Sequence, residues 1–182
     1  MDFSNAKTFQ SHGDGVIRLD AFKSLGENAI FENGVLVFHE ESISLGANVY
    51  VGHNAILKAY YKNEMIIGSD TWIGQGCYFH SAGGITIGKA VGIGPMVKML
   101  TSYHIEGDID KPVMHNELAF EAIIIGDGAD IGVGSTILPG VTIGKGAIVG
   151  AGSVVTNDIP EYAIAAGVPA RVMRMREDKD SA

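Results

Sequence analysis

The side chains best suited to proton transfer in this chain are its histidines. Imidazole has an ordinary pKa of about 6.5, so at neutral pH it can take a proton from a hydroxyl or an amine and return it later. A histidine is more often a polar surface residue, however, so its type alone selects no catalytic group. The choice depends on the elements that position each ring. The six histidines are His12, His39, His53, His80, His104 and His115.

Composition narrows the class of protein. The chain has 182 residues, 46% hydrophobic and 19% charged, with a formal net charge of −8 and a single cysteine. These values exclude a disordered chain and a disulfide scaffold, and the acidic balance argues against a nucleic-acid partner. No run approaches the roughly 18 apolar residues of a membrane span. The segment MDFSNAKTFQ lacks a basic-then-apolar signal, so we expect a cytoplasmic protein.

Glycine is the anomaly, and a six-residue repeat explains it. The 25 glycines are about 14% of the chain, roughly twice the average. Three hexads form a block of 18 residues, and each hexad begins with a large apolar residue. The second position is glycine in 11 of 12 first and second hexads, Glu32 being the exception, and never in a third hexad. The hexads begin at Leu25, Phe31, Val37; Leu45, Val51, Leu57; Ile67, Ile73, Phe79; Ile87, Ile93, Met99; Ile125, Ile131, Ile137; and Ile143, Val149, Val155.

This pattern predicts an all-β solenoid. Each hexad is interpreted as a short strand and a sharp corner, with its first residue inward and glycine supplying a backbone conformation that other residues avoid. Three hexads close one triangular coil, and six coils spaced by about 4.8 Å make a prism on the order of 29 Å long. The lone Cys77 falls at an inward fifth position, so we interpret it as a buried small hydrophobe rather than a nucleophile.

The repeat also sets the predicted boundaries. The solenoid covers residues 25–160, with an N-terminal cap over 1–24 that forms a strand or helix, and a C-terminal cap and tail over 161–182. A long excursion covers 105–124, and an insertion of this length in so regular a solenoid is more often functional than accidental. His104 stands at the mouth of this excursion.

These residues resemble the hexapeptide-repeat acyltransferases. The most specific part is ILPGVTIGKGAIVGAGSVVTNDIPEYAIAAGVPARVMR, which is similar to the galactoside, maltose and cell-surface-sugar acetyltransferase branch. The resemblance implies a left-handed parallel β-helix, a hand that the periodicity alone does not give. It also implies acetyl transfer from acetyl-CoA to a hydroxyl or amine of a sugar or nucleotide-sugar acceptor, in polysaccharide or lipopolysaccharide assembly.

The resemblance assigns the catalytic role to one histidine. The run IGPMVKMLTSYH matches the family's coil that ends in the catalytic histidine, which makes His104 the general base. A backbone carbonyl or a side chain must orient its ring, and Asp108, Asp110 and Glu117 are the candidates nearby. His115 matches the family's acceptor loop, although it can equally be a surface residue. His80, one coil earlier, can face the same cleft or be exposed.

The cofactor residues also come from the resemblance. Ala151 and Thr156 match positions where pantetheine and adenine pack, and Arg171 and Arg174 match positions that meet phosphate; both arginines can equally belong to a solvated terminal strand. The family often has lysine where this chain has Asn157, which removes one phosphate contact. The family forms homotrimers with each site between two subunits, and no metal is expected.

Two alternatives remain open on the sequence. One is a zinc hydrase of the γ-carbonic anhydrase type on the same fold, which needs three converging histidines. His80, His104 and His115 lack the close pair typical of that class. The other is a non-catalytic β-helix scaffold, which predicts no coenzyme A binding.

Overall fold

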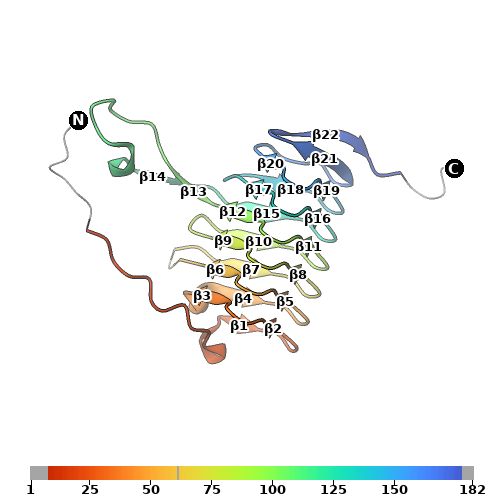
Figure 1. The fold of residues 1–182 in the computed structure, drawn as a ribbon, viewed down its shortest axis with the longest axis horizontal. Coiled ribbons are helices and arrows are strands. Elements are labelled where there is room, and N and C mark those ends of the chain that lie inside the picture. Colours follow the sequence, from red (N-terminus) through yellow and green to blue (C-terminus); the bar gives the residue numbers. More distant parts are fainter. Residues whose placement is uncertain (1–7, 61, 178–182) are drawn as a thin grey trace.

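The protein is a three-sided prism of short parallel strands. The computed structural model describes residues 8–60 and 62–177, and Figure 1 shows the coils stacked along one axis with an arm projecting from one side. Three parallel sheets form the sides. The fold class predicted from the sequence, an all-β left-handed parallel β-helix, is confirmed.

Each complete coil contributes one strand to each sheet. The first sheet contains β1 (Ser24–Leu25), β4 (Ile43–Leu45), β7 (Met65–Ile67), β10 (Ile85–Ile87), β15 (Ile123–Ile125) and β18 (Thr142–Ile143). The second contains β2 (Ile30–Phe31), β5 (Tyr50–Val51), β8 (Trp72–Ile73), β11 (Gly92–Ile93), β16 (Asp130–Ile131) and β19 (Ile148–Val149). The third contains β3 (Leu36–Phe38), β6 (Ile56–Lys58), β9 (Tyr78–His80), β12 (Lys98–Leu100), β17 (Thr136–Ile137) and β20 (Val154–Val155).

The strand register confirms the predicted hexads. Leu45 pairs with Leu25 on one side and with Ile67 on the other, so first positions stack on first positions from coil to coil. Sixteen of the 18 predicted first positions are buried, and Leu25 and Phe31 in the first coil are half-buried against the core. Burial of these side chains is the main favourable contribution to folding, at roughly 25 cal/mol per Å² of apolar surface.

The glycines at the second position have a different physical reason from the one predicted. None of the 11 has a positive φ; instead, a Cβ at each would lie under 3.0 Å from an atom of the next coil. At Gly74 that atom is the backbone nitrogen of Pro95, at 2.5 Å. The residue is glycine because consecutive coils touch at the corner, and a backbone neighbour cannot move aside for a methyl group.

Positive φ values occur two residues later, at the fourth position. At 11 of the 12 fourth positions of the first and second hexads, φ lies between 53° and 72°. At the twelfth, Gly34, φ is 79°. Glycine, asparagine and aspartate adopt this left-handed region most easily, which explains ten of the residues found there. The 12 are Asn28, Gly34, Asn48, Asn54, Asp70, Gly76, Ala90, Met96, Gly128, Gly134, Gly146 and Gly152.

The excursion leaves the prism as an antiparallel hairpin. Its two strands are β13 (Ser102–His104) and β14 (Leu118–Phe120), so the chain departs from the coil before residue 105, and Ile123 and Ile124 already belong to β15. A short 3-10 helix, η3 (Val113–His115), lies between them. His104 is therefore not the last residue of the coil, as the repeat implied, but part of the projecting arm in Figure 1.

The caps are simpler than the prism. In the predicted N-terminal cap, the described part holds only the 3-10 helix η1 (Leu19–Ala21) before β1, and a second 3-10 helix, η2 (Glu40–Ser42), joins the first two coils. At the other end β21 (Ala163–Gly167) continues the second sheet and pairs antiparallel with β22 (Ala170–Met175). Residues 1–7 and 178–182 of the two predicted caps lie outside the described residues. Over 8–60 and 62–177, no helix is long and apolar enough to cross a membrane.

Substitutions at the two kinds of glycine should have different effects on stability. Gly74→Ala should lower the free energy of unfolding by about 1–3 kcal/mol or more, because its methyl group meets backbone that cannot move. Gly128→Asn is the matched control, because its φ of 64° suits asparagine and a Cβ there meets no atom within 4 Å. Thermal unfolding followed by circular dichroism measures both. Equal stability of the two variants would contradict the close-approach explanation.

Candidate active site

His104 lies on one face of the β13–β14 hairpin. It pairs with Leu118, and Ser102 pairs with Phe120. Residues two apart on a strand, and residues opposite each other on paired strands, share a face. His104, Ser102, Leu118 and Phe120 therefore lie on the same face, and Tyr103 lies on the other.

The ring of His104 is oriented by a backbone carbonyl. Its Nδ1 lies 3.2 Å from the carbonyl oxygen of Asn116. A carbonyl only accepts, so Nδ1 carries the hydrogen and donates it, which leaves the lone pair on Nε2. This assignment gives His104 the tautomer that a general base needs.

Asn116 holds the loop that carries this carbonyl. It is buried within an otherwise exposed segment, and its side-chain amide donates to the carbonyl of Ile105 at 3.2 Å. The carboxylates suggested by the sequence, Asp108, Asp110 and Glu117, are all exposed, and the orienting group is the carbonyl next to Glu117. Asn116 was missed because a hydrogen bond to a main-chain carbonyl leaves no signal in residue type.

A cavity of about 150 Å³ adjoins the face of the hairpin that bears His104. It lies between this face and the third sheet. His80 lines it, and so do three residues of the hairpin face that also bears His104, whereas His104 itself does not. The lining residues are Tyr60, Lys62, His80, Ala82, Ser102, Leu118 and Phe120.

His80 is electrostatically unusual within this cavity. Burial lowers its pKa, and the nearby charge of Lys58 lowers it further. Its Nε2 lies 3.4 Å from the hydroxyl of Tyr60. Its Nδ1 is buried and has no hydrogen-bond partner among the described residues. A buried polar atom without a partner is costly, so this nitrogen is an unsatisfied group beside the cavity.

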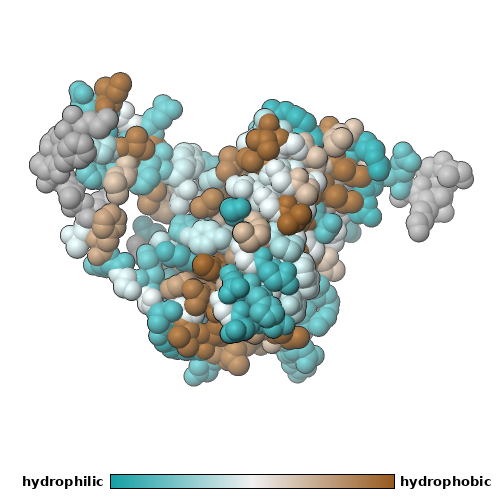
Figure 2. Space-filling view, viewed as in Figure 1, coloured by the Kyte–Doolittle hydropathy of each residue, from teal (hydrophilic) through white to brown (hydrophobic). Residues whose placement is uncertain are grey.

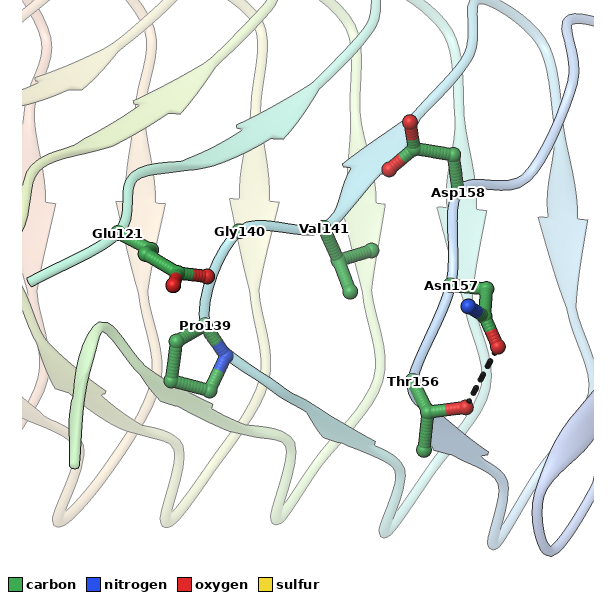
Figure 3. Close-up of a pocket in the computed structure, with 7 residues that line it drawn as sticks. All are labelled: Glu121, Pro139, Gly140, Val141, Thr156, Asn157 and Asp158. Atoms are coloured by element: carbon green, nitrogen blue, oxygen red, sulfur yellow. Dashed lines mark hydrogen bonds between the residues drawn. The ribbon is translucent and has the colours of Figure 1, made fainter. Parts of the chain in front are cut away.

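A second cavity lies toward the C-terminal end of the prism. Tyr103, on the opposite face of the hairpin, donates from its hydroxyl to Glu121 at 2.8 Å, and this contact raises the pKa of Tyr103. Glu121 lines a cavity of about 540 Å³, shown in Figure 3, in which Thr156 donates to the side-chain oxygen of Asn157 at 3.0 Å. Its other lining residues are Pro139, Gly140, Val141 and Asp158. Figure 2 shows the surface notched between the arm and this end of the molecule.

The remaining cofactor candidates are spread out rather than gathered. Ala151 is exposed at the corner between β19 and β20. Arg174 lines a cavity of about 310 Å³ on the C-terminal hairpin, together with Arg176. Arg171, on the same strand β22, donates to the carbonyl of its neighbour Ala170. Within one chain, the cofactor candidates therefore extend from the sixth coil to the C-terminal hairpin.

Two further candidates have simpler environments. Cys77 is fully buried, donates to the carbonyl of Gly94 at 3.3 Å, and has a pKa raised to about 11 by burial. It is therefore a protonated core thiol at neutral pH, as the repeat position predicted. His115 is partly exposed and is the last residue of the 3-10 helix η3. Its backbone N–H donates to the carbonyl of Pro112.

Metal ligands do not converge in the part of the chain that the structure describes. No three histidine, cysteine, aspartate or glutamate side chains there are grouped so that they could hold a metal ion. His80, His104 and His115 form no such group among these residues.

Comparison with known proteins gives the family. A model described as bacterial transferase hexapeptide (six repeats) matches residues 122–157. Galactoside O-acetyltransferase of Escherichia coli (strain K12) is 35% identical over 162 residues, which cover 88% of this chain and 68% of that protein. The chain belongs to the hexapeptide-repeat transferase family. The resemblance drawn from its sequence is confirmed.

Two solved structures that are similar to this chain contain bound coenzyme A. Galactoside acetyltransferase in complex with coenzyme A is 31% identical, with a TM-score of 0.67 over 88% of this chain and 68% of that one. A mutant of AntD, an N-acyltransferase from Bacillus cereus, in complex with dTDP and coenzyme A, is 25% identical. Its TM-score is 0.76 over 86% of this chain and 85% of that one.

The Asn116 clamp can be tested in this hexapeptide-repeat transferase. Asn116→Ala removes the hydrogen bond to Ile105, worth about 1 kcal/mol, so the rate of acyl transfer should fall roughly fivefold. The global fold should persist, because the loop lies outside the prism. Steady-state kinetics with Asn33→Ala, an exposed asparagine of the first coil, as control measures the effect. An unchanged rate would show that the amide of Asn116 does not hold the loop.

Proposed function

We propose that this protein transfers an acetyl group from acetyl-CoA to a hydroxyl or amine of a sugar or nucleotide-sugar acceptor, with His104 as general base. The observation that carries this proposal is the hydrogen bond between His104 Nδ1 and the carbonyl of Asn116. It presents Nε2 as an acceptor on a hairpin that has a cavity on each side.

The proposed reaction is direct transfer. Nε2 of His104 takes the proton from the acceptor hydroxyl or amine while that atom attacks the thioester carbonyl. The tetrahedral intermediate collapses, the carbon–sulfur bond breaks, and the imidazolium returns the proton to the leaving thiolate of coenzyme A. No acyl-enzyme is needed, and the buried thiol of Cys77 supports this direct route.

The two cavities suit two substrates. The larger cavity beside Thr156 and the arginine-containing hairpin lie toward the C-terminal end, and we assign them to the donor, with Ala151, Arg171 and Arg174 as further contacts. The coenzyme A complexes of the relatives support a coenzyme A donor. The cavity beside His80 is assigned to the acceptor, with His115 in the loop above it.

A homotrimer is part of the proposal. The arm exposes a row of apolar side chains, among them Ile109 at 88% and Val113 at 63% exposure. Apolar side chains gathered on one projecting segment are typical of an interaction surface, and a second copy of the chain would bury them beside the site. We further propose a cytoplasmic role in cell-surface polysaccharide assembly. The dTDP-4-amino-4,6-dideoxy-D-glucose acyltransferase of Escherichia coli, which is similar to this chain, supports a nucleotide-sugar acceptor.

The role of His104 has a direct test. His104→Ala should reduce acetyl transfer by roughly 10²-fold or more, with thermal stability retained, because no other base is placed on the hairpin face. Release of free thiol from acetyl-CoA, across galactosides, amino-sugar nucleotides, serine and simple polyols, measures the activity. His53→Ala, at an exposed corner, is the matched control. Full turnover in the His104 variant would refute the assigned role, and absence of any coenzyme A binding would favour a scaffold.

The arm predicts the assembly state. The wild-type protein should have about three times the chain mass of 19.2 kDa, roughly 58 kDa, by light scattering. A variant with Ile109→Asp and Val113→Asp should shift toward monomer, because burying two carboxylates in an apolar interface is costly. Leu19→Asp, which is 60% exposed at the far end of the prism, is the control. A monomeric wild-type protein would contradict the trimer.

A further inference from the structure

A cluster of imidazole and phenol rings lies next to the proposed acceptor cavity. The ring centre of His12 is 5.3 Å from that of Tyr60 and 6.0 Å from that of His39. The rings of His39 and Tyr60 are stacked, with centres 5.9 Å apart. The cluster joins the N-terminal segment to the first coils, and Figure 1 shows this segment on the side where the arm projects. None of the reaction steps proposed above uses it.

The cluster lines a cavity that adjoins the one beside His104. This cavity has a volume of about 240 Å³ and is lined by Gln10, Ser11, His12, His39 and Tyr60. Tyr60 also lines the cavity between the third sheet and the hairpin. The two cavities therefore share the side chain of Tyr60, and we refer to the pair, between the hairpin and the N-terminal segment, as the path.

The path is rich in cationic and proton-accepting groups. Lys58 pairs in register with His80 on the third sheet, and its Nζ lies 5.5 Å from the centre of the Tyr60 ring. No carboxylate of the described residues makes an ion pair with Lys58. The carboxylate that meets this group of rings is Glu41, whose Oε1 is 3.2 Å from Nδ1 of His39. In a chain of net charge −8, this local excess of cations is distinctive.

The pKa shifts of these groups reflect burial and repulsion by neighbouring charge. Burial lowers the pKa of Lys58, and burial together with the charge of Lys58 lowers the pKa values of His12 and His80. Tyr78, stacked on His80, has a pKa raised by burial and brings no charge at neutral pH. Lys62, at the hairpin end of the path, adds another cation. A bound anion would offset the repulsion among these groups.

We propose that this path is a phosphate-binding subsite for the acceptor, which makes the preferred acceptor a phosphorylated, nucleotide-activated sugar rather than a neutral glycoside. The inference rests on the proposed acetyl transfer. Lys58, His12 and His39 would hold the diphosphate, and the sugar would lie beside His80 with its nucleophile near His104. Adjacent coils are about 4.8 Å apart, and the subsite begins one or two coils before the coil from which the hairpin projects.

The region assigned to the phosphates of the donor lies elsewhere on the chain. The cavity beside Thr156 and the arginines of β22 lie on the other side of the hairpin, toward the C-terminal end. The cluster around Lys58 lies toward the N-terminal end, in coils one to three. One chain therefore presents two separate cationic regions, on opposite sides of His104.

A binding experiment tests the subsite without turnover. Inorganic pyrophosphate is titrated into the full protein, and the imidazole protons are followed by NMR. Saturable binding should raise the pKa values of His12 and His80, because the anion stabilises their charged forms. Lys58→Met and His39→Gln should each weaken the affinity about tenfold, and Lys89→Met, an exposed lysine on another side of the prism, should not. No saturable binding, or equal affinity in all variants, would overturn the subsite.

A kinetic experiment separates this inference from the proposed function. Lys58→Met should raise KM for a dTDP-linked amino sugar about tenfold, with the KM values for a neutral galactoside and for acetyl-CoA unchanged. An equal rise for the galactoside, or a rise for acetyl-CoA, would overturn the acceptor-phosphate assignment while acetyl transfer itself still stands. If His104→Ala retains activity and Lys58→Met still weakens pyrophosphate binding, the proposed base fails and the subsite stands.

Discussion

The close contact between consecutive coils at two of their three corners is the constraint on which the structure depends. At these corners the backbone of one coil lies where a Cβ of the previous coil would be, as Gly74 and Pro95 illustrate. The contact keeps the coils at hydrogen-bonding distance and lets the first positions stack as a continuous core. The third side is free of this constraint, so it can carry larger outward residues such as Lys58 and His80. These two proposed acceptor contacts and the projecting hairpin belong to this side.

The scaffold was largely predictable from the sequence because its determinants are local and periodic. The apolar first positions and the glycines recur every six residues, and the structure pairs them as the repeat indicated. The reason for the glycines was not predictable, because it lies in contact between residues about 20 apart in the chain. A count of glycine cannot distinguish a position with positive φ, such as Gly128, from one with a close neighbour, such as Gly74.

The site was predictable in part. His104 was singled out because it stands where the repeat stops and because the run that ends in it resembles the family's catalytic coil, and its role stays a prediction. Its place on a hairpin depends on pairing with Leu118, across a loop without periodicity. The group that orients it is a main-chain carbonyl, which every residue possesses, so sequence reasoning turned to nearby carboxylates instead. The ring cluster of His12, His39 and Tyr60 joins segments far apart in the chain, and no spacing rule connects them.

The way the arm is attached has a consequence for how such proteins diversify. β10 and β15 pair in full register, with Ile85 opposite Ile123 and Ile87 opposite Ile125, even though the whole hairpin and loop intervene. The ladder closes beneath the arm as it does beneath the short connections elsewhere. The coils therefore keep their pairing whatever segment leaves the prism at this corner. The length of the loop beyond β13 and β14 is not fixed by the stacking of the coils.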